Sequence, residues 1–395
     1  PISDRSSSTA RTHAMKLPAI VPLACAILLL LVNLNVSPVE SSRPHPPGQG
    51  HHHDHDHDHD RDGHDHDRHG RHHHDHDDYD GYSFYVFGDS FADNGNLPHK
   101  DGVLSPMTRQ WYTPYSGTGR FSNGNVQSDF IANMLGQSGS PPARRLHDPA
   151  GREGMNFAAG GSGVFQVSGT KTLHKQVHIF KRLVRQGDID QENLGNSVAL
   201  VAVSGNDYNH IGVDTSGFAD ITAFVDNVTT EIQANVKDLL EAGVQKVLVN
   251  NLFPLGCAPS QTKPNHTECN DQANQGASLH NRYLSAKLAD MDNVRVLDLN
   301  AAFNTILAHH ADGRGAVAKQ FGRKLRPCCE PADDRSYCGL TVWDTNGVDM
   351  VDSYQVCPEP ERAFFWDEMN PTNAGWAAVM GQLESSIKEF LGLDS

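Results

Sequence analysis

The chain has 395 residues, of which 37% are hydrophobic, and it carries a formal net charge of −16 with its histidines neutral. Half of the acidic excess lies in residues 51–80, which hold eleven Asp against three Arg. Because no basic stretch stands out in the rest of the sequence, the composition argues against nucleic acid as a partner.

The first predicted element is a secretory signal. Met15 and Lys16 precede LPAIVPLACAILLLLV, an apolar run of sixteen residues that gives way to SPVESSRP. This pattern predicts a signal peptide over residues 15–42, and residues 1–14 are interpreted as upstream or vector-derived sequence. A membrane span is the alternative, but a span needs about 20 apolar residues. We therefore expect a secreted protein, extracellular or in the cell wall, with no transmembrane span after signal removal.

Residues 43–80 are expected to form a disordered tail rich in His and Asp. Residues 51–80 contain thirteen His and almost no apolar side chain, so they cannot bury a core. Neutral imidazoles are common ligands of divalent metals, which predicts weak metal binding here; a solvated spacer is the alternative. No cofactor is expected to be required. The first candidate ligands in the tail are His51, His52, His53, His55, His57 and His59.

From residue 81 to residue 395 the sequence alternates between apolar strands and helical segments. This alternation predicts one α/β domain, a three-layer α/β/α architecture around a central, mostly parallel five-stranded sheet. Residues 325–362 are expected to form a long loop held by disulfides. The expected strands are residues 82–87, 154–159, 197–204, 245–252 and 293–299. The expected helices are residues 126–135, 172–187, 218–243, 268–292 and 373–391.

Six cysteines remain once the signal, with Cys25, is removed. An even number in a secreted chain implies disulfides, with 15 possible pairings of six thiols. Cys257 and Cys269 close a short loop, whereas Cys328 and Cys329 are expected to reach Cys338 and Cys357 rather than each other. Two glycosylation sequons, at Asn227 and Asn265, fit the same compartment.

Three turns at successive strand ends carry the candidate chemistry. Gly88-Asp89-Ser90 follows the first strand and exposes a serine hydroxyl for attack on an acyl carbon. Gly160 and Gly161 follow the second strand, and Asn206 follows the third. Taken singly, each is ordinary turn chemistry; together, their N–H groups and that of Ser90 predict an oxyanion-binding site.

These stretches resemble the plant-type GDSL esterase/lipase family of the SGNH hydrolase superfamily. FYVFGDSFADNGN, GMNFAAGGSG, SGNDY and NLFPLGCAP occur in the family's order, and the resemblance covers residues 82–391. It implies the SGNH hydrolase fold and carboxylic-ester hydrolysis. It also implies Ser90 as nucleophile and oxyanion donor, Gly161 and Asn206 as the other donors, and Asp367 as the residue that orients the base.

The base itself departs from the family pattern. The family's last block reads Asp-x-x-His-Pro-Thr, and here it reads Asp367-Glu-Met-Asn370-Pro-Thr. An amide has no proton-accepting nitrogen at neutral pH, so Asn370 cannot deprotonate Ser90. His309, His310, Glu368 and the tail histidines are weak substitutes. In a serine protease, loss of the base costs about 10⁶ in kcat.

Two functions are therefore expected. The first is a secreted esterase/lipase that acts on acyl or acetyl esters of lipids or cell-wall glycans through Ser90, with reduced turnover. The second is an inactive relative that binds a small-molecule ester or an acylated glycan, or that sequesters metal through its tail.

Overall fold

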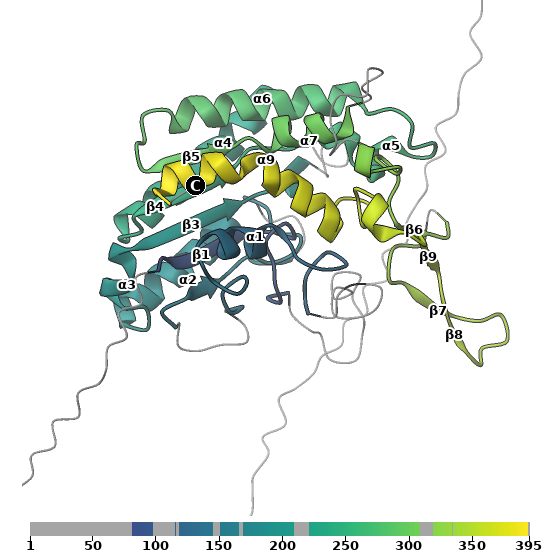
Figure 1. Cartoon of the computed structure of the whole chain (residues 1–395), viewed down its shortest axis with the longest axis horizontal. Helices are drawn as coiled ribbons and strands as arrows, with labels where there is room; N and C mark the ends of the chain where they lie inside the picture. Colours follow the sequence, from purple (N-terminus) through teal and green to yellow (C-terminus); the bar gives the residue numbers. More distant parts are fainter. Residues whose placement is uncertain are drawn as a thin grey trace, which may run out of the picture. The chain divides into compact units, whose positions relative to one another are not determined.

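Five parallel strands form the central sheet, in the order β2-β1-β3-β4-β5 (Figure 1). The pairing is parallel throughout, and Gly88 at the end of β1 lies opposite Ala202 at the end of β3. This confirms the expected sheet, although β2 to β5 are shorter than the sequence predicted, whereas β1 has the expected length and lies one residue later. The strands are β1 (Ser83–Gly88), β2 (Gly154–Asn156), β3 (Ser197–Ala202), β4 (Lys246–Asn250) and β5 (Val294–Leu297).

The computed structural model describes residues 81–97, 115, 118–144, 151–165, 169–208, 221–308, 319–333 and 335–393. The expected upstream sequence, signal peptide and tail lie outside these residues, and so do His309 and His310.

All five expected helices are present. Three of them begin directly after a polar residue whose side chain caps the first turn. Thr172 accepts a hydrogen bond from Lys175 N at the start of α2, and Thr372 accepts one from Gly375 N at the start of α9. The helices are α1 (Gln127–Met134), α2 (Leu173–Gln186), α3 (Gln191–Gly195), α4 (Ile221–Glu241), α5 (Pro259–Thr262), α6 (Asp271–Leu288), α7 (Leu299–Leu307) and α9 (Asn373–Leu391), with short 3₁₀ turns η2 (Asn206–Tyr208), η3 (Leu255–Cys257) and η4 (Pro360–Arg362).

Two apolar layers bury the two faces of the sheet. Side chains alternate along each strand, so Phe84 and Val86 of β1 join α1, α7 and α9 in one layer, while Tyr85 and Phe87 join α2 and α4 in the other. Helix α6 packs beside α4 and contributes to both layers. This arrangement confirms the three-layer α/β/α architecture and leaves the carboxyl ends of the strands for the site.

Between residues 328 and 357 the chain is held by disulfides, as expected, but it is not simply a long loop. Strand β6 (Cys329–Pro331) pairs with β9 (Tyr354–Val356), and β7 (Thr341–Trp343) pairs with β8 (Met350–Asp352), both antiparallel. The disulfides are Cys257–Cys269, Cys328–Cys357 and Cys329–Cys338. They agree with the pairings that the cysteine spacing favoured.

Within the described residues, no helix has both the length and the apolar character that a membrane crossing requires.

Candidate active site

The serine turn begins at Gly88, the last residue of β1. Gly88 has φ 130°, and a Cβ there would lie 2.0 Å from the carbonyl oxygen of Ala202 on the neighbouring strand. Only glycine fits this position. The chain then turns sharply, with Ala92 N and Asp93 N donating to the carbonyl of Asp89. Ser90 therefore lies half-buried at the carboxyl end of the sheet, as the sequence predicted.

Asp89 fixes this turn from inside. Its Oδ1 accepts from Phe91 N at 3.1 Å, and its Oδ2 accepts from Ser204 N and Ser204 Oγ at 2.6 and 2.7 Å. The carboxylate is fully buried, and burial raises its pKa to about 7 against the opposing effect of these hydrogen bonds. The residue before the serine thus ties the end of β1 to the loop after β3.

The loop after β2 passes close to the serine turn. Ala159 N donates to Gly88 O at 3.0 Å, and Gly160 N donates to Asp93 Oδ2 at 2.8 Å. A Cβ at Gly160 would meet the Phe121 ring at 2.1 Å, and Gly161 has φ 74°. The two glycines are needed for close approach and for the left-handed backbone, and the N–H of Gly160 is already bonded to Asp93.

The Asn206 amide lies between these two loops. Its Nδ2 donates to Asp89 Oδ2 at 3.0 Å and to Ser162 O at 2.8 Å. The structure thereby brings together the three turns that the sequence singled out. Because both amide hydrogens have protein acceptors, donation to an oxyanion would require one of these bonds to be shared or released.

Asp367 and Asn370 form a closed hydrogen-bonded pair in the loop before α9. Asp367 Oδ1 accepts from the backbone N–H groups of Met369 and Asn370 at 2.9 and 2.7 Å. Asn370 Nδ2 donates to both carboxylate oxygens, each at 3.1 Å. Both side chains are buried, and Asn370 Oδ1 has no hydrogen-bond partner among the described residues. The Asn370 amide is therefore held by Asp367 through its nitrogen, and its oxygen is left without a partner among the described residues.

Tyr115 is a further partner of Asp367 that the sequence did not indicate. Its hydroxyl donates to Asp367 Oδ2 at 2.9 Å, and its ring packs edge-on against Trp366 and Phe121. Burial raises the pKa of Asp367, and the donors from Asn370, Met369 and Tyr115 oppose that rise.

Aromatic packing brings this loop to the serine turn. The Trp376 ring of α9 lies edge-on to Phe91, the residue after Ser90, with centroids 4.9 Å apart. On the other side, Phe121 lies against Gly160 and packs edge-on against Tyr115, the partner of Asp367. The last loop of the chain is thus held beside both the serine turn and the glycine loop.

Gln176 is a second positioning residue that sequence reasoning missed. This buried side chain on α2 accepts from Gly88 N at 2.8 Å and donates to Gly88 O at 2.9 Å and to Ser162 Oγ at 3.1 Å. The sequence contains one indication of this role, because Gln176 is a polar residue on the apolar face of the helix predicted over residues 172–187. It fixes the end of β1 relative to the loop after β2.

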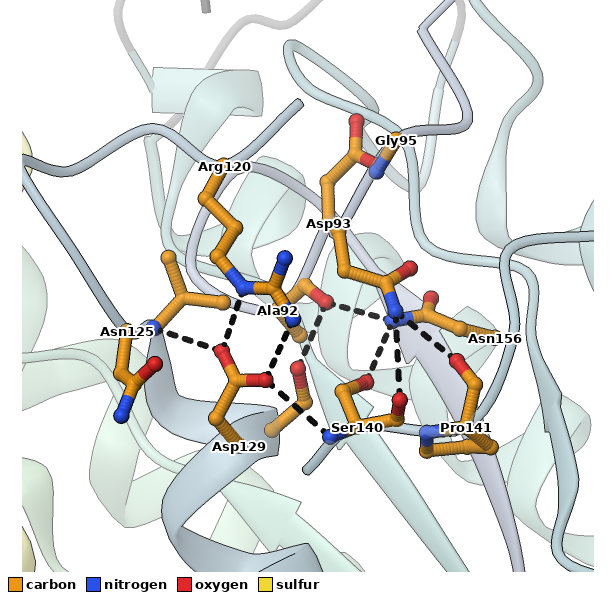
Figure 2. Close-up of polar contacts among 12 residues, drawn as sticks. Ala92, Asp93, Gly95, Arg120, Asn125, Asp129, Ser140, Pro141 and Asn156 are labelled. Carbon is orange, nitrogen blue, oxygen red and sulfur yellow. Dashed lines mark hydrogen bonds and ion pairs between the residues drawn. The ribbon is translucent and has the colours of Figure 1, made fainter. Parts of the chain in front are cut away.

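A polar network reaches the serine turn at Ala92 (Figure 2). Arg120 binds Asp129 through two hydrogen bonds of 2.8 and 2.6 Å, and Asp129 also accepts from Ser140 N. Asn156 Nδ2 donates to Ala92 O at 2.7 Å, two residues after Ser90. These contacts join α1, β2 and the serine turn into one scaffold.

Of the weak substitutes for the base, Glu368 alone lies within the described residues. Glu368 is bonded to Lys263, so its side chain is engaged at the surface. His309, His310 and the tail histidines lie outside the described residues. His280, which sequence reasoning did not consider, contacts Tyr208 Oη at 2.7 Å, and burial lowers its pKa to about 3, making it a poor base.

The remaining predictions from the sequence are of metal-binding residues and of glycosylation sites. Within the part of the chain that the structure describes, no group of three or more His, Cys, Asp or Glu could hold a metal ion. Asn227 is exposed on α4, although Thr229 of its sequon is buried in the helix. Asn265 is exposed in the loop closed by Cys257 and Cys269.

Comparison with known proteins identifies the class. Residues 84–382 match the GDSL-like lipase/acylhydrolase family model. One Arabidopsis thaliana GDSL esterase/lipase is 35% identical over 326 residues, covering 78% of this chain and 87% of the relative. A second from the same plant is 33% identical over 326 residues, covering 77% of this chain and 88% of its own. The chain belongs to the GDSL-like lipase/acylhydrolase family, and by family it is a carboxylic-ester hydrolase acting on small-molecule esters.

A catalytic mutant of the acetylxylan esterase Axe2 from Geobacillus stearothermophilus is a structural neighbour with a TM-score of 0.36 and 13% identity, covering 80% of this chain and 95% of its own. A likeness of this size bears on neither substrate nor mechanism.

Proposed function

We propose that the protein is a secreted esterase/lipase, extracellular or in the cell wall, that hydrolyses acyl or acetyl esters of lipids or cell-wall glycans with Ser90 as nucleophile. Its turnover is reduced because Asn370 stands at the position of the base. The observation that carries this proposal is the pair of hydrogen bonds from Asn370 Nδ2 to Asp367, each 3.1 Å long. They support the proposal that this amide stands where the family pattern has an imidazole.

In the proposed reaction, Ser90 Oγ attacks the ester carbonyl, and the N–H groups of Ser90, Gly161 and Asn206 stabilise the oxyanion. One hydrogen of Asn206 Nδ2 would be shared between Ser162 O or Asp89 and the substrate. Oxyanion donors alone supply a factor of about 10² to 10³ each. The Ser90 proton passes to water or to the leaving alkoxide, because Asn370 Oδ1 is a very weak base. Collapse of the tetrahedral intermediate breaks the ester C–O bond and releases the alcohol, and water then hydrolyses the acyl-serine to give the carboxylic acid and free Ser90.

The test is hydrolysis of p-nitrophenyl acetate by the wild type and by Ser90→Ala. We expect slow but measurable wild-type turnover that Ser90→Ala abolishes. Equal rates for the two proteins would show that Ser90 is not the nucleophile. A circular dichroism spectrum and a thermal midpoint for each protein confirm that both are folded.

The second candidate is a non-catalytic protein that keeps the site to bind an ester or acylated glycan. The same buried Asn370 favours it, since Asp367 is fully hydrogen-bonded without any catalytic partner. Calorimetric binding of an acetylated xylo-oligosaccharide, with no acetate released over the same period, would select this alternative over the esterase.

We further infer that the tail binds divalent metal weakly through His51, His52, His53, His55, His57 and His59 and that catalysis requires no cofactor. The motivation is compositional, because the tail alternates imidazoles with carboxylates.

A further inference from the structure

An exposed hairpin of apolar side chains precedes the catalytic loop in the chain. The exposed hairpin is residues 341–352, formed by β7 and β8 and the turn between them. Trp343 is 65% exposed, Val348 70% and Met350 50%. Of the seven large hydrophobic side chains that are exposed among the described residues, five lie on this hairpin and a sixth follows on β9. The seven are Ile221, Val342, Trp343, Val348, Met350, Val351 and Val356.

The exposed hairpin is apolar on both of its faces. Val342 lies opposite Val351, and Trp343 lies opposite Met350. Residues directly opposite share a face and neighbouring residues alternate, so the two valines mark one face and the Trp-Met pair marks the other. A second copy of the chain or another folded protein packed on one face would leave the other face in water. A lipid interface can contact both.

The charges of the exposed hairpin indicate which class of lipid headgroup it would contact. Residues 341–352 contain Asp344, Asp349 and Asp352 and no Lys or Arg, so an anionic surface would repel them. In phosphatidylcholine the outermost group is a quaternary ammonium, which aromatic rings and carboxylates bind. Tryptophan favours the boundary between headgroups and acyl chains, and the aliphatic side chains suit the layer beneath.

The base of the exposed hairpin is fixed to the candidate active site. Disulfides Cys329–Cys338 and Cys328–Cys357 hold the segment on either side of it. Cys328 N donates to Phe365 O at 3.0 Å and Cys329 N to Trp366 O at 2.7 Å, immediately before Asp367. A surface bound by the exposed hairpin would therefore be held at a fixed position relative to Asp367 and Asn370.

We propose that the exposed hairpin docks the protein on zwitterionic phosphatidylcholine surfaces and so brings acyl esters to the site. The inference deepens the proposed function and rests on it for the identity of the substrate. Docking itself requires no turnover, so an experiment can contradict the docking proposal and leave the proposed esterase function standing, or the reverse.

The test is co-sedimentation of the purified chain with sucrose-loaded phosphatidylcholine vesicles. Three variants are compared with the wild type: Trp343→Ser on one face, Val342→Ser with Val351→Ser on the other, and Ile221→Ser on α4 as the control for loss of an exposed apolar side chain elsewhere. We expect the first two to weaken binding by about tenfold or more, as lost apolar burial implies, and the control to bind like the wild type.

Replacing part of the phosphatidylcholine with phosphatidylglycerol should also weaken binding. In addition, Trp343 emission should shift to the blue on docking, and Trp343→Ser should remove the shift.

Three outcomes would overturn the proposal. The first is no sedimentation with phosphatidylcholine vesicles. The second is a dimer in solution that Trp343→Ser dissociates while the valine variant does not, which would assign one face to a second copy. The third is retention on insoluble acetylated xylan that needs Trp343 and exceeds retention on vesicles, which would assign a glycan. Hydrolysis of soluble p-nitrophenyl acetate, measured on the same variants, reports on the proposed function alone.

Discussion

At the scale of single residues, the Asn370 side chain makes more hydrogen bonds to Asp367 than a histidine side chain there could make. Its Nδ2 donates to both carboxylate oxygens and its backbone N–H adds a third bond. A histidine has one Nδ1–H to offer. An asparagine is therefore compatible with a closed, hydrogen-bonded loop, and under the proposed function its lack of a proton acceptor accounts for low turnover.

The buried carboxylates Asp89 and Asp93 make the stability of the fold depend on pH. Burial raises the folded-state pKa of Asp89 from its ordinary value of 3.8 to about 7 and that of Asp93 to about 6. The folded state then keeps protons that the unfolded state has released. The stability contribution is full below about pH 4 and is lost as pH rises through about 6 to 7.

The free energy of unfolding should accordingly fall between about pH 4 and about pH 7, and Asp89→Asn should flatten this dependence. Urea denaturation at a series of pH values measures both slopes. The Asp89→Asn variant should keep a smaller dependence of stability on pH, because Asp93 still titrates in this range. Identical slopes in the variant and the wild type would mean that Asp89 is ionised throughout this range.

Some site residues are visible in the sequence and others are not. Ser90 and Asn206 stand at the ends of apolar strands, and Asn370 stands in a recognisable motif. Tyr115 bonds to Asp367 across 252 residues, and Gln176 bonds to Gly88 across 88. Such pairs depend on tertiary packing, which no local pattern encodes.

At the scale of elements, long apolar or amphipathic segments were predictable and short exposed ones were not. The buried strand β3 and the amphipathic helix α4 follow from periodicity alone. Strands β7 and β8 have three residues each and exposed side chains, and they form within a region closed by disulfides. Strands of three residues are too short to give the alternating hydrophobic pattern from which a strand is predicted.

The disulfides should contribute unequally to stability. Cys328–Cys357 spans 29 residues and Cys329–Cys338 spans 9. In the chain-entropy account a longer loop gives more stabilisation, by about 1 kcal/mol for this ratio of lengths, within a typical range of about 2 to 5 kcal/mol for each bridge.

Paired Cys→Ser variants of each bridge, compared by chemical denaturation, measure this difference. The Cys328/Cys357 variant should be the less stable of the two. The mature protein, without Cys25 of the expected signal, should show no free thiol toward Ellman's reagent without reduction, and two reactive thiols would contradict the three-bridge arrangement.

At the scale of the whole molecule, the tail and the catalytic domain should be separable. Residues 44–79 contribute almost no apolar side chains, so deleting them should leave the thermal midpoint in EDTA nearly unchanged. The same deletion should remove most nickel or zinc binding, measured by calorimetry. A large fall in the midpoint would show that the tail takes part in the fold.

The central claim is that the site is complete except for its base, and Asn370→His tests it most directly. If Asn370 stands at the position of the base, as proposed, an imidazole there would have Asp367 on one nitrogen and Ser90 on the other. Turnover of p-nitrophenyl acetate should rise by several orders of magnitude, up to the roughly 10⁶ that the base contributes in a serine protease. It should also gain a pH dependence centred near pH 6 to 7, and Ser90→Ala in the same background should abolish the gain. Wild-type hydrolysis at ordinary enzymatic rates, changed less than about tenfold by Asn370→His, would contradict the claim by showing that another base serves Ser90.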